Sequence, residues 1–525
     1  MPDSCIANTA CGPVRGECAG GVRVWRGIPY AAAPEGGLRF RRPRPAAGWE
    51  GLLDATGFGP MCTQARSMEG RAAVSAMSED CLTLNIWAPA EGGGEGSAIP
   101  VPAENGGESP EPLSPTGGGK RPVLFYIHGG SFLEGAGSDS EYDGANLARE
   151  GDVVVVTINY RLGVFGFMDF SFLGDGFSAN CGIWDIIAAL RWVNENIGAF
   201  GGDAGNVTAC GQSAGATCAS ILPMVGEAAG YIKQVIMMSA VPILFHSKEE
   251  AQRIARRYME FMGLPDADSL MGAPADVLAA GQKGFAHSCG LGTSTYGPCV
   301  DGEGVASFPI RAAADGRMAG IPALVGVTRD ELSILLKKSL SELFDVTEIR
   351  KMGTRAENED AARRISGVYK SAGRRAPAVM MTDFIFHMPC LWFAEAYGQN
   401  ADAWMYRFDY QTLGMRVSGL RSFHSSDIPF LFGNFDAGLA HYMMLITPCK
   451  KWARKVYREL QGDFLAFMWT GELPWEKCGE GSAPAKFYAP RPSVGQLKSE
   501  EVKRAFDGSE IKRKSLAGED IVTMQ

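Results

Sequence analysis

Short apolar runs alternate with longer amphipathic segments along most of the chain. The runs are rich in β-branched and aromatic residues, as is typical of strands buried on both faces, and they span 82–88, 122–127, 153–158, 206–211, 234–239, 323–328 and 404–408. The clearest amphipathic segment is 182–198, whose apolar residues recur every three or four positions and predict a helix with one apolar face. Strands that alternate with helices predict an α/β fold with a large, mostly parallel central sheet covered by helices on both faces.

Two further segments bear on the domain organisation. Residues 91–119 contain nine Gly, five Pro and five Glu, and such a composition cannot bury enough apolar area to offset chain entropy, so we expect a flexible surface loop. A linker between domains is the alternative, but the runs on either side resemble strands of one sheet. Residues 331–400 contain charged helical segments, which we expect to form a helical cap above the sheet. The whole chain, 1–525, is therefore predicted to be a single domain.

Charge and composition exclude several classes of function. The 525 residues have a net charge of −9, which is the wrong sign for binding nucleic acid through its phosphates. The chain contains no run of 18 apolar residues and begins without the basic and apolar regions of an export signal. We therefore expect no nucleic acid partner, no membrane partner and a cytoplasmic location, unless a leader has been removed.

The cysteines also favour a cytoplasmic location. Thirteen cysteines in a chain without an export signal predict mostly reduced thiols. No CxxC pair and no HExxH motif occurs, so we expect no metal site.

The strongest local signal for chemistry is the sequence Gly211-Gln212-Ser213-Ala214-Gly215. It follows the predicted strand 206–211 directly and leads into a stretch of small and apolar residues, 216–222. A serine in this setting lies on a tight turn between strand and helix, where small neighbours are needed and the hydroxyl is exposed. GxSxG patterns also arise by chance in a Gly-rich chain, so the flanking strand and helix are essential to the prediction that Ser213 is a nucleophile.

A second glycine-rich turn, His128-Gly129-Gly130-Ser131-Phe132, follows the predicted strand 122–127. Glycines let the main chain approach a reacting carbonyl, so backbone N–H groups can bind the oxygen on which negative charge develops. A structural turn is the alternative. For His128 itself we expect a role in holding this loop.

A serine nucleophile needs a histidine base and an orienting acid, and in this type of fold the chain order is serine, acid, histidine. His424 lies in a polar loop after the strand 404–408, so its position favours it as the base. Asp330 and Glu331 follow the strand 323–328 at the carboxyl edge of the sheet, and by order alone either could be the acid. The remaining histidines are expected to be structural: His128, His246, His287, His387 and His441.

Several longer motifs resemble the type-B carboxylesterase family. Residues 200–216 are similar to the family's nucleophile signature and residues 78–89 to its second signature. Other similar segments follow in order from 22–49 to 467–475, so that the resemblance covers roughly nine-tenths of the chain. Among subfamilies, the chain is most similar to bacterial para-nitrobenzyl-esterase-type enzymes. The resemblance implies the α/β-hydrolase fold and hydrolysis of small-molecule carboxylic esters without a cofactor.

Carried over residue by residue, the resemblance implies specific roles. The nucleophile is Ser213, the acid is Glu331 and the base is His424. The backbone donors of the oxyanion hole are Gly130, Ser131 and Ala214.

The resemblance also implies two structural pairs. Arg39 and Glu79 match a buried ion pair of the family. Cys62 and Cys81 match a pair that is bonded in exported relatives, but without a signal peptide we expect the dithiol form at least as readily as the disulfide.

Some positions depart from the family pattern. Ser131 stands where the third residue of the family's oxyanion loop is often Gly or Ala, and Leu332 replaces the Gly that usually follows the acid. Residues 237–242 differ from the family's QSGS, so we expect the serine that supports the acid to be missing. No Trp lies between Cys62 and Cys81, where cholinesterases bind a quaternary ammonium, so choline esters are expected to be poor substrates.

Together these features predict a serine hydrolase that cleaves carboxylic esters through an acyl-enzyme intermediate. An amidase or thioesterase with the same residues is an alternative. A binding protein without activity is a weaker one, because such relatives lose the serine or the histidine. The protein is expected to be a monomer or a small homo-oligomer, and the sequence does not specify the natural ester.

Overall fold

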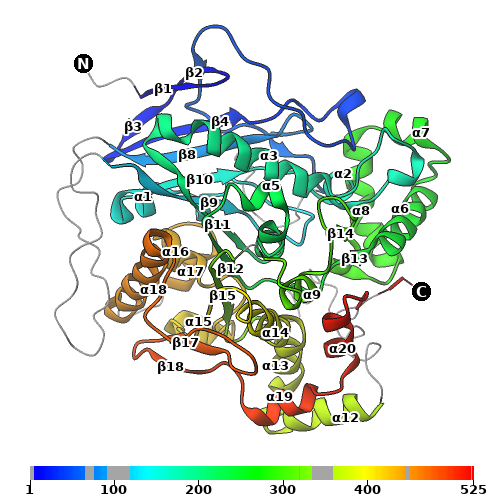
Figure 1. Cartoon of the computed structure of the whole chain (residues 1–525), viewed down its shortest axis with the longest axis vertical. Coiled ribbons are helices and arrows are strands. Elements are labelled where there is room, and N and C mark those ends of the chain that lie inside the picture. The colour runs from blue at the N-terminus through cyan, green and yellow to red at the C-terminus, as the bar shows by residue number, and fades with distance from the viewer. Residues whose placement is uncertain are drawn as a thin grey trace.

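The computed structural model describes residues 5–65, 76–90, 119–318, 320–333, 359–444, 450–521 and 523–524. Its centre is an 11-stranded sheet with the order β18-β17-β16-β15-β12-β11-β9-β10-β8-β4-β3 (Figure 1). The strands are β3 (Glu17–Ala19), β4 (Val22–Pro29), β8 (Thr83–Pro89), β9 (Arg121–Ile127), β10 (Val154–Ile158), β11 (Gly202–Gln212), β12 (Gln234–Met238), β15 (Ala323–Thr328), β16 (Ala403–Phe408), β17 (Pro484–Tyr488) and β18 (Ser493–Gln496).

All seven apolar runs are strands of this sheet, with small shifts at their ends. The strands from β10 to β17 in the sheet order pair in parallel, which confirms the mostly parallel arrangement. The antiparallel additions at the two edges, β8, β4 and β3 on one side and β18 on the other, make the sheet mixed. The periodicity did not predict β4, whose register shifts between Trp25 and Ile28 and so breaks the alternation of side chains.

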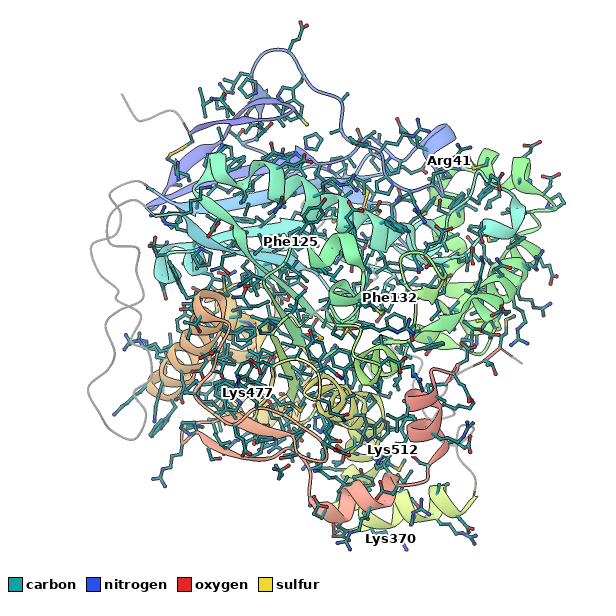
Figure 2. The ribbon with its side chains drawn as sticks, in the orientation of Figure 1. Arg41, Phe125, Phe132, Lys370, Lys477 and Lys512 are labelled. Carbon is teal, nitrogen blue, oxygen red and sulfur yellow. A yellow bond between two sulfur atoms is a disulfide. The ribbon has the colours of Figure 1, made fainter. Side chains whose placement is uncertain are left out.

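Both faces of the sheet are buried, and successive strand residues contribute to different cores. In β9, Val123, Phe125 and Ile127 belong to one core, which α3 (Cys181–Asn196) covers. Leu124 and Tyr126 belong to the other core, covered by α1 (Ala145–Gly151), α16 (Ile428–Phe432) and α18 (Lys450–Thr470). Figure 2 shows Phe125 at the middle of the molecule, whereas Lys370 and Lys512 lie at its rim. Helix α3 corresponds to the predicted helix 182–198 and ends in a 3-10 turn at Ile197–Phe200.

The predicted cap is described only in part. Its described elements are α12 (Glu359–Val368), a 3-10 segment (Lys370–Arg375), α13 (Ala376–Thr382), a π-helical turn (Asp383–His387) and α14 (Met388–Tyr397). Almost every residue of α14 is buried, and this helix packs against β15 and β16. This part of the predicted cap is therefore a core layer of the sheet. The helical segment 339–352 and nearly all of the predicted loop 91–119 lie outside the described residues.

Candidate active site

Ser213 lies at the turn between β11 and α4 (Ala214–Ala219), with a left-handed φ of 56°. Two close approaches explain its glycine neighbours. A Cβ on Gly215 would lie 2.1 Å from the carbonyl oxygen of Ile127, and one on Gly211 would lie 2.3 Å from the carbonyl carbon of Gly215. Because the helix must start this close to β9, only glycine fits at either position. The predicted turn with a serine at its apex is therefore present.

Glu331 and His424 are in contact at the same edge of the sheet. The Nδ1 atom of His424 lies 2.6 Å from Oε2 of the fully buried Glu331. The other carboxylate oxygen accepts hydrogen bonds from the backbone N–H of Thr328 and the hydroxyl of Ser239, both at 2.7 Å. Burial raises the pKa of Glu331. The charge and hydrogen bond of His424 and the hydrogen bond of Ser239 lower this pKa by more than burial raises it, so the net shift is downward. The carboxyl group is thus held as an anion that can orient the Nδ1–H of His424.

The structure distinguishes between the two candidate acids. Asp330 points to a different set of partners: Arg329 at 3.0 Å, the amide of Gln411 at 3.1 Å and the guanidinium of Arg375. Glu331 alone of the two contacts His424.

The expectation that the supporting serine is missing was wrong. Ser239 donates to Glu331 from the first position after β12, where its φ of 54° turns the side chain toward the carboxylate. The difference from the family motif lies in the residues around this serine, so a comparison of motif letters overlooked the hydroxyl group itself.

Backbone hydrogen bonds join the loops that carry these residues. Since parallel strands bring their carboxyl ends to one edge, loops far apart in sequence become neighbours there. The bonds connect the N–H of Ser213 to Met238, of Ser239 to Gly326, of Asp330 to Ser422 and of His424 to Glu331. The serine turn, the acid and the histidine are thus linked through one continuous set of main-chain contacts.

The second ring nitrogen of His424 faces the serine turn. Its Nε2 atom lies 3.1 Å from Nε2 of Gln212, the residue before Ser213. Among the described residues, the hydrogen-bond partner of this nitrogen is therefore Gln212 and not the Ser213 hydroxyl. The ring of Phe386 packs against the imidazole, with 4.9 Å between ring centroids. The sequence reasoning did not assign Gln212 or Phe386, although the position of Gln212 beside the apex serine was a usable signal.

The predicted oxyanion loop lies directly against Ser213. A Cβ on Gly129 would be 3.1 Å from the Cβ of Ser213. The loop turns through three consecutive positive φ angles at Gly130, Ser131 and Phe132. In the described part of the chain, the N–H groups of Gly130, Ser131 and Ala214 have no acceptor. Donors of this kind, next to a nucleophile, can bind an oxyanion.

Side chains around this loop hold its shape. Nδ1 of His128 lies 2.8 Å from the carbonyl oxygen of Gly129, and the imidazole stacks on Tyr160 at 4.5 Å. Phe132 is buried against Phe167, as its interior place in Figure 2 illustrates. These contacts agree with the structural role expected for His128.

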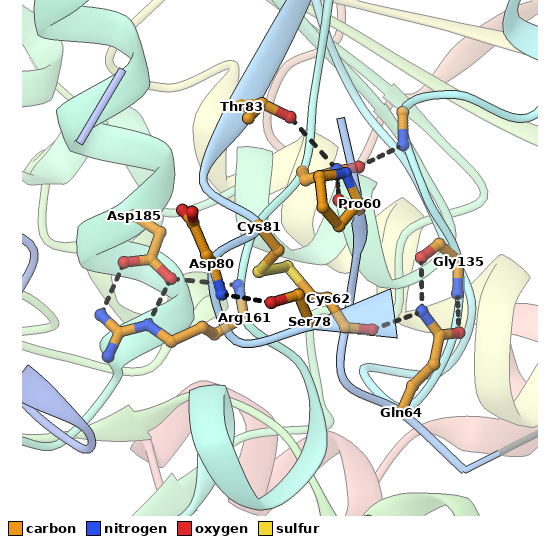
Figure 3. Close-up of a disulfide and its surroundings, with 12 residues drawn as sticks. Pro60, Cys62, Gln64, Ser78, Asp80, Cys81, Thr83, Gly135, Arg161 and Asp185 are labelled. Carbon is orange, nitrogen blue, oxygen red and sulfur yellow. Dashed lines mark hydrogen bonds and ion pairs between the residues drawn. A yellow bond between two sulfur atoms is a disulfide. The ribbon is translucent and has the colours of Figure 1, made fainter. Parts of the chain in front are cut away.

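A disulfide lies close to the oxyanion loop, at a pair that the resemblance had left open between the dithiol and the disulfide form. Cys62 and Cys81 are bonded to each other (Figure 3). The side chain of Gln64 accepts from the N–H of Gly135 at 2.9 Å and donates to its carbonyl at 3.0 Å, so the disulfide-bonded segment is tied to the chain that follows the oxyanion loop (Figure 3).

Cys5 and Cys18 form a second disulfide, which the sequence did not predict. Eight other cysteines in the described ranges form no disulfide. The implied ion pair is present, with Nε of Arg39 at 2.6 Å from Glu79.

Neither a membrane span nor a metal site is found in the described ranges. No helix there is long and apolar enough to cross a bilayer. No group of three or more potential metal ligands occurs among the same residues.

Comparisons with known proteins identify the family. The carboxylesterase family matches residues 3–468. The para-nitrobenzyl esterase of Bacillus subtilis is 35% identical over 475 residues, which cover 89% of this chain and 90% of that protein. The phenmedipham hydrolase of Pseudarthrobacter oxydans is 30% identical over 82% of this chain and 83% of its own length.

Solved structures agree with this similarity. A para-nitrobenzyl esterase superposes with a TM-score of 0.81 at 31% identity, covering 95% of this chain and 99% of the other. A carboxylesterase of Geobacillus stearothermophilus superposes with a TM-score of 0.78 at 34% identity and the same coverage. The fold is thus that of the α/β-hydrolases. With this fold and these relatives, the chain belongs to the carboxylesterase family and is a serine hydrolase of carboxylic esters.

Proposed function

We propose that Ser213, His424 and Glu331 form the catalytic triad of this esterase. The main support is the contact of His424 with the fully buried Glu331, at 2.6 Å, beside the turn that carries Ser213. The neighbouring loop supports an oxyanion hole made of the N–H groups of Gly130, Ser131 and Ala214.

In this mechanism Ser213 attacks the ester carbonyl while His424 takes its proton. The Nε2 atom of His424 exchanges its contact with Gln212 for the serine hydroxyl, and Glu331 stabilises the imidazolium that forms. The oxyanion hole binds the developing charge, and removal of one such donor typically costs about 100- to 1000-fold in rate. His424 then protonates the departing alcohol, and water cleaves the acyl-enzyme by the same steps.

A series of para-nitrophenyl esters of increasing acyl length, together with a para-nitrobenzyl ester, tests this proposal. The para-nitrobenzyl ester is included because a relative carries that name. We expect Ser213→Ala to lose at least about 1000-fold in kcat. The matched control is Ser220→Ala, at the C-terminal end of α4, whose hydroxyl donates to the carbonyl of Thr217. Retention of full activity by Ser213→Ala would contradict the triad.

The cytoplasmic location remains our proposal, with an ester as the small-molecule partner and neither nucleic acid nor membrane as a partner. The two disulfides weigh against the cytoplasm, because its reductants keep most thiols reduced. Thiol titration of protein isolated under acid quench decides this point: two bonded pairs argue for an oxidising compartment. Sedimentation measures whether the protein is a monomer or a small homo-oligomer.

A further inference from the structure

The side chain of Gln212 lies between three parts of the proposed site. Gln212 is the last residue of β11, and only 3% of its surface is exposed. Its amide nitrogen lies 3.1 Å from Nε2 of His424. Its amide oxygen lies beside Gly129, where a Cβ would be 2.8 Å from this oxygen and 3.1 Å from the Cβ of Ser213. One planar amide is thus next to the base, the nucleophile and the oxyanion loop.

Glycine at position 129 makes room for this amide. A side chain there would displace either the amide oxygen of Gln212 or the Cβ of Ser213, because both lie closer to the Cβ position than ordinary contact allows. Gly129 directly precedes Gly130, one of the proposed oxyanion donors. The amide oxygen of Gln212 is therefore held at the edge of the space in which the acyl group reacts.

The two ends of the amide differ in their partners. The nitrogen contacts His424, whereas the oxygen accepts no hydrogen bond from the described residues. This oxygen is not fully enclosed by protein atoms, so a water molecule can reach it. Polar atoms in nearly buried positions are normally bonded, either to protein or to ordered water. We therefore expect a water molecule to be the partner of this oxygen.

Water differs from the other nucleophiles of the mechanism in the number of its protons. The hydroxyl of Ser213 and the hydroxyl of an alcohol each have one O–H group, and they give this proton to His424 as they attack. Water has two. When water attacks the acyl-enzyme, one proton passes to Nε2 of His424 and then to the Ser213 oxygen as the bond between that oxygen and the acyl carbon breaks. The other proton stays on the carboxylic acid that forms, and its O–H group can donate to an acceptor throughout.

We propose that Gln212 positions the water that cleaves the acyl-enzyme: its amide oxygen accepts the second O–H of a water whose first O–H is directed at Nε2 of His424. An alcohol that attacks in place of water has no second O–H and gains nothing from this acceptor. Gln212 therefore favours hydrolysis over transfer of the acyl group to alcohols. This role rests on the proposed function of Ser213, His424 and Glu331, and it adds the acyl acceptor that the site selects.

Gln212→Met tests this role, because it removes the acceptor and keeps the length of the side chain. Variant and wild type each turn over a para-nitrophenyl ester at one fixed concentration of methanol, and chromatography measures the acid and the methyl ester that form. We expect the ratio of acid to methyl ester to fall by about three- to tenfold, the usual effect of one hydrogen bond. Gln212→Glu, which keeps an oxygen at this position, should stay close to the wild-type ratio.

Gln64→Met is the matched control. Gln64 is also a buried amide, but it bonds to the backbone of Gly135, which follows the oxyanion loop. Its loss should slow hydrolysis and methanolysis alike and leave the ratio unchanged. A merely structural role of Gln212 would likewise lower both rates together, so an unchanged ratio in Gln212→Met would overturn the proposal. An equal fall of the ratio in Gln64→Met would also overturn it, because the effect would not depend on the oxygen of Gln212.

The ratio does not depend on the fraction of the enzyme that is folded, so a partly unstable variant still gives a result. If Gln212→Met does not fold at all, Gln212→Asn replaces it: the shorter side chain withdraws the oxygen from the water, and the same fall is expected. Ser213→Ala, measured in parallel, separates this test from the proposed function. Full activity of that variant contradicts the triad, whereas its inactivity together with an unchanged ratio in the Gln212 variants contradicts only the role of Gln212.

Discussion

At the residue scale, the hydrogen-bond donors around Glu331 suit it to the role of the proposed acid, and an acidic side chain at this place in the chain is not sufficient by itself. Glu331 is fully buried, and an unpaired buried carboxylate is costly. His424, Ser239 and the N–H of Thr328 together cover both of its oxygens. The neighbouring Asp330 has equally many polar partners but faces a different group of side chains, so contact and not residue type distinguishes the two.

Removal of the Ser239 hydroxyl provides a test at this scale. Ser239→Ala should destabilise the protein by about 1.5 to 3 kcal/mol at pH 7, the usual contribution of a hydrogen bond to a charged group. Because the pKa of folded Glu331 lies below the ordinary value of 4.5, its stabilising effect is present above that value and is lost as the pH falls through the folded pKa. The difference between variant and wild type should therefore shrink in acid.

Urea unfolding at pH 7 and at the lowest pH below 4.5 at which the protein is still folded measures this effect. Ser220→Ala, which loses a bond to a neutral carbonyl, is the control and should cost about 0.5 to 1.5 kcal/mol at both pH values. An equal cost for Ser239→Ala at the two pH values would argue against a bond to an ionised carboxylate.

At the element scale, disulfides and side-chain hydrogen bonds hold the segments near the strands in place. The Cys62–Cys81 disulfide closes a segment of 19 residues, and Gln64 joins this segment to Gly135. The Cys5–Cys18 disulfide closes 13 residues and joins the N-terminal segment to β3. Two bonds of similar span thus differ in their distance from the oxyanion loop.

Loss of either disulfide should lower the free energy of unfolding by about 3 kcal/mol, because the unfolded chain regains loop entropy. The double variant Cys62→Ala/Cys81→Ala should also lower kcat, since the oxyanion loop loses part of its support. Chemical denaturation and ester kinetics measure the two quantities separately. The Cys5→Ala/Cys18→Ala variant serves as the comparison; an equal loss of kcat in both would show that Gln64 does not couple the first disulfide to the site.

At the scale of the whole molecule, one sheet joins the two ends of the chain. β3 and β4 come from the N-terminal part and β17 and β18 from the C-terminal part. β8, before the predicted loop 91–119, pairs with β10, which follows it. We therefore propose that 1–525 is a single domain and that residues 91–119 do not link two domains.

Cleavage at a protease site inserted into 91–119 tests the single domain. Because β8 is buried between β4 and β10, the two fragments should remain associated and keep most of the activity of the uncut variant. Gel filtration and ester kinetics before and after cleavage provide the measurement. Separation of two folded fragments would support the linker instead.

The sequence alone was sufficient for seven strands of the sheet, from β8 to β16 in the sheet order, and for the main helix and the serine turn, because each depends on neighbours within a few residues; β3, β4, β17 and β18 were not predicted. Apolar runs identify strands buried on both faces, and Gly211 and Gly215 identify a turn with no room for a Cβ. The strand β4 escaped notice because its bulge breaks the local pattern. Residue order had left Asp330 and Glu331 as candidates for the acid, and the resemblance to the family favoured Glu331.

Only the tertiary structure decided which side chains meet. Ser239 supports Glu331, Gln212 contacts His424, and Cys62 is bonded to Cys81. These contacts join segments that are far apart in the chain, and they depend on the path of each loop after its strand. Local patterns carry no information on such paths, because burial and hydrogen bonding in the folded molecule, and not the residues nearby in sequence, determine them.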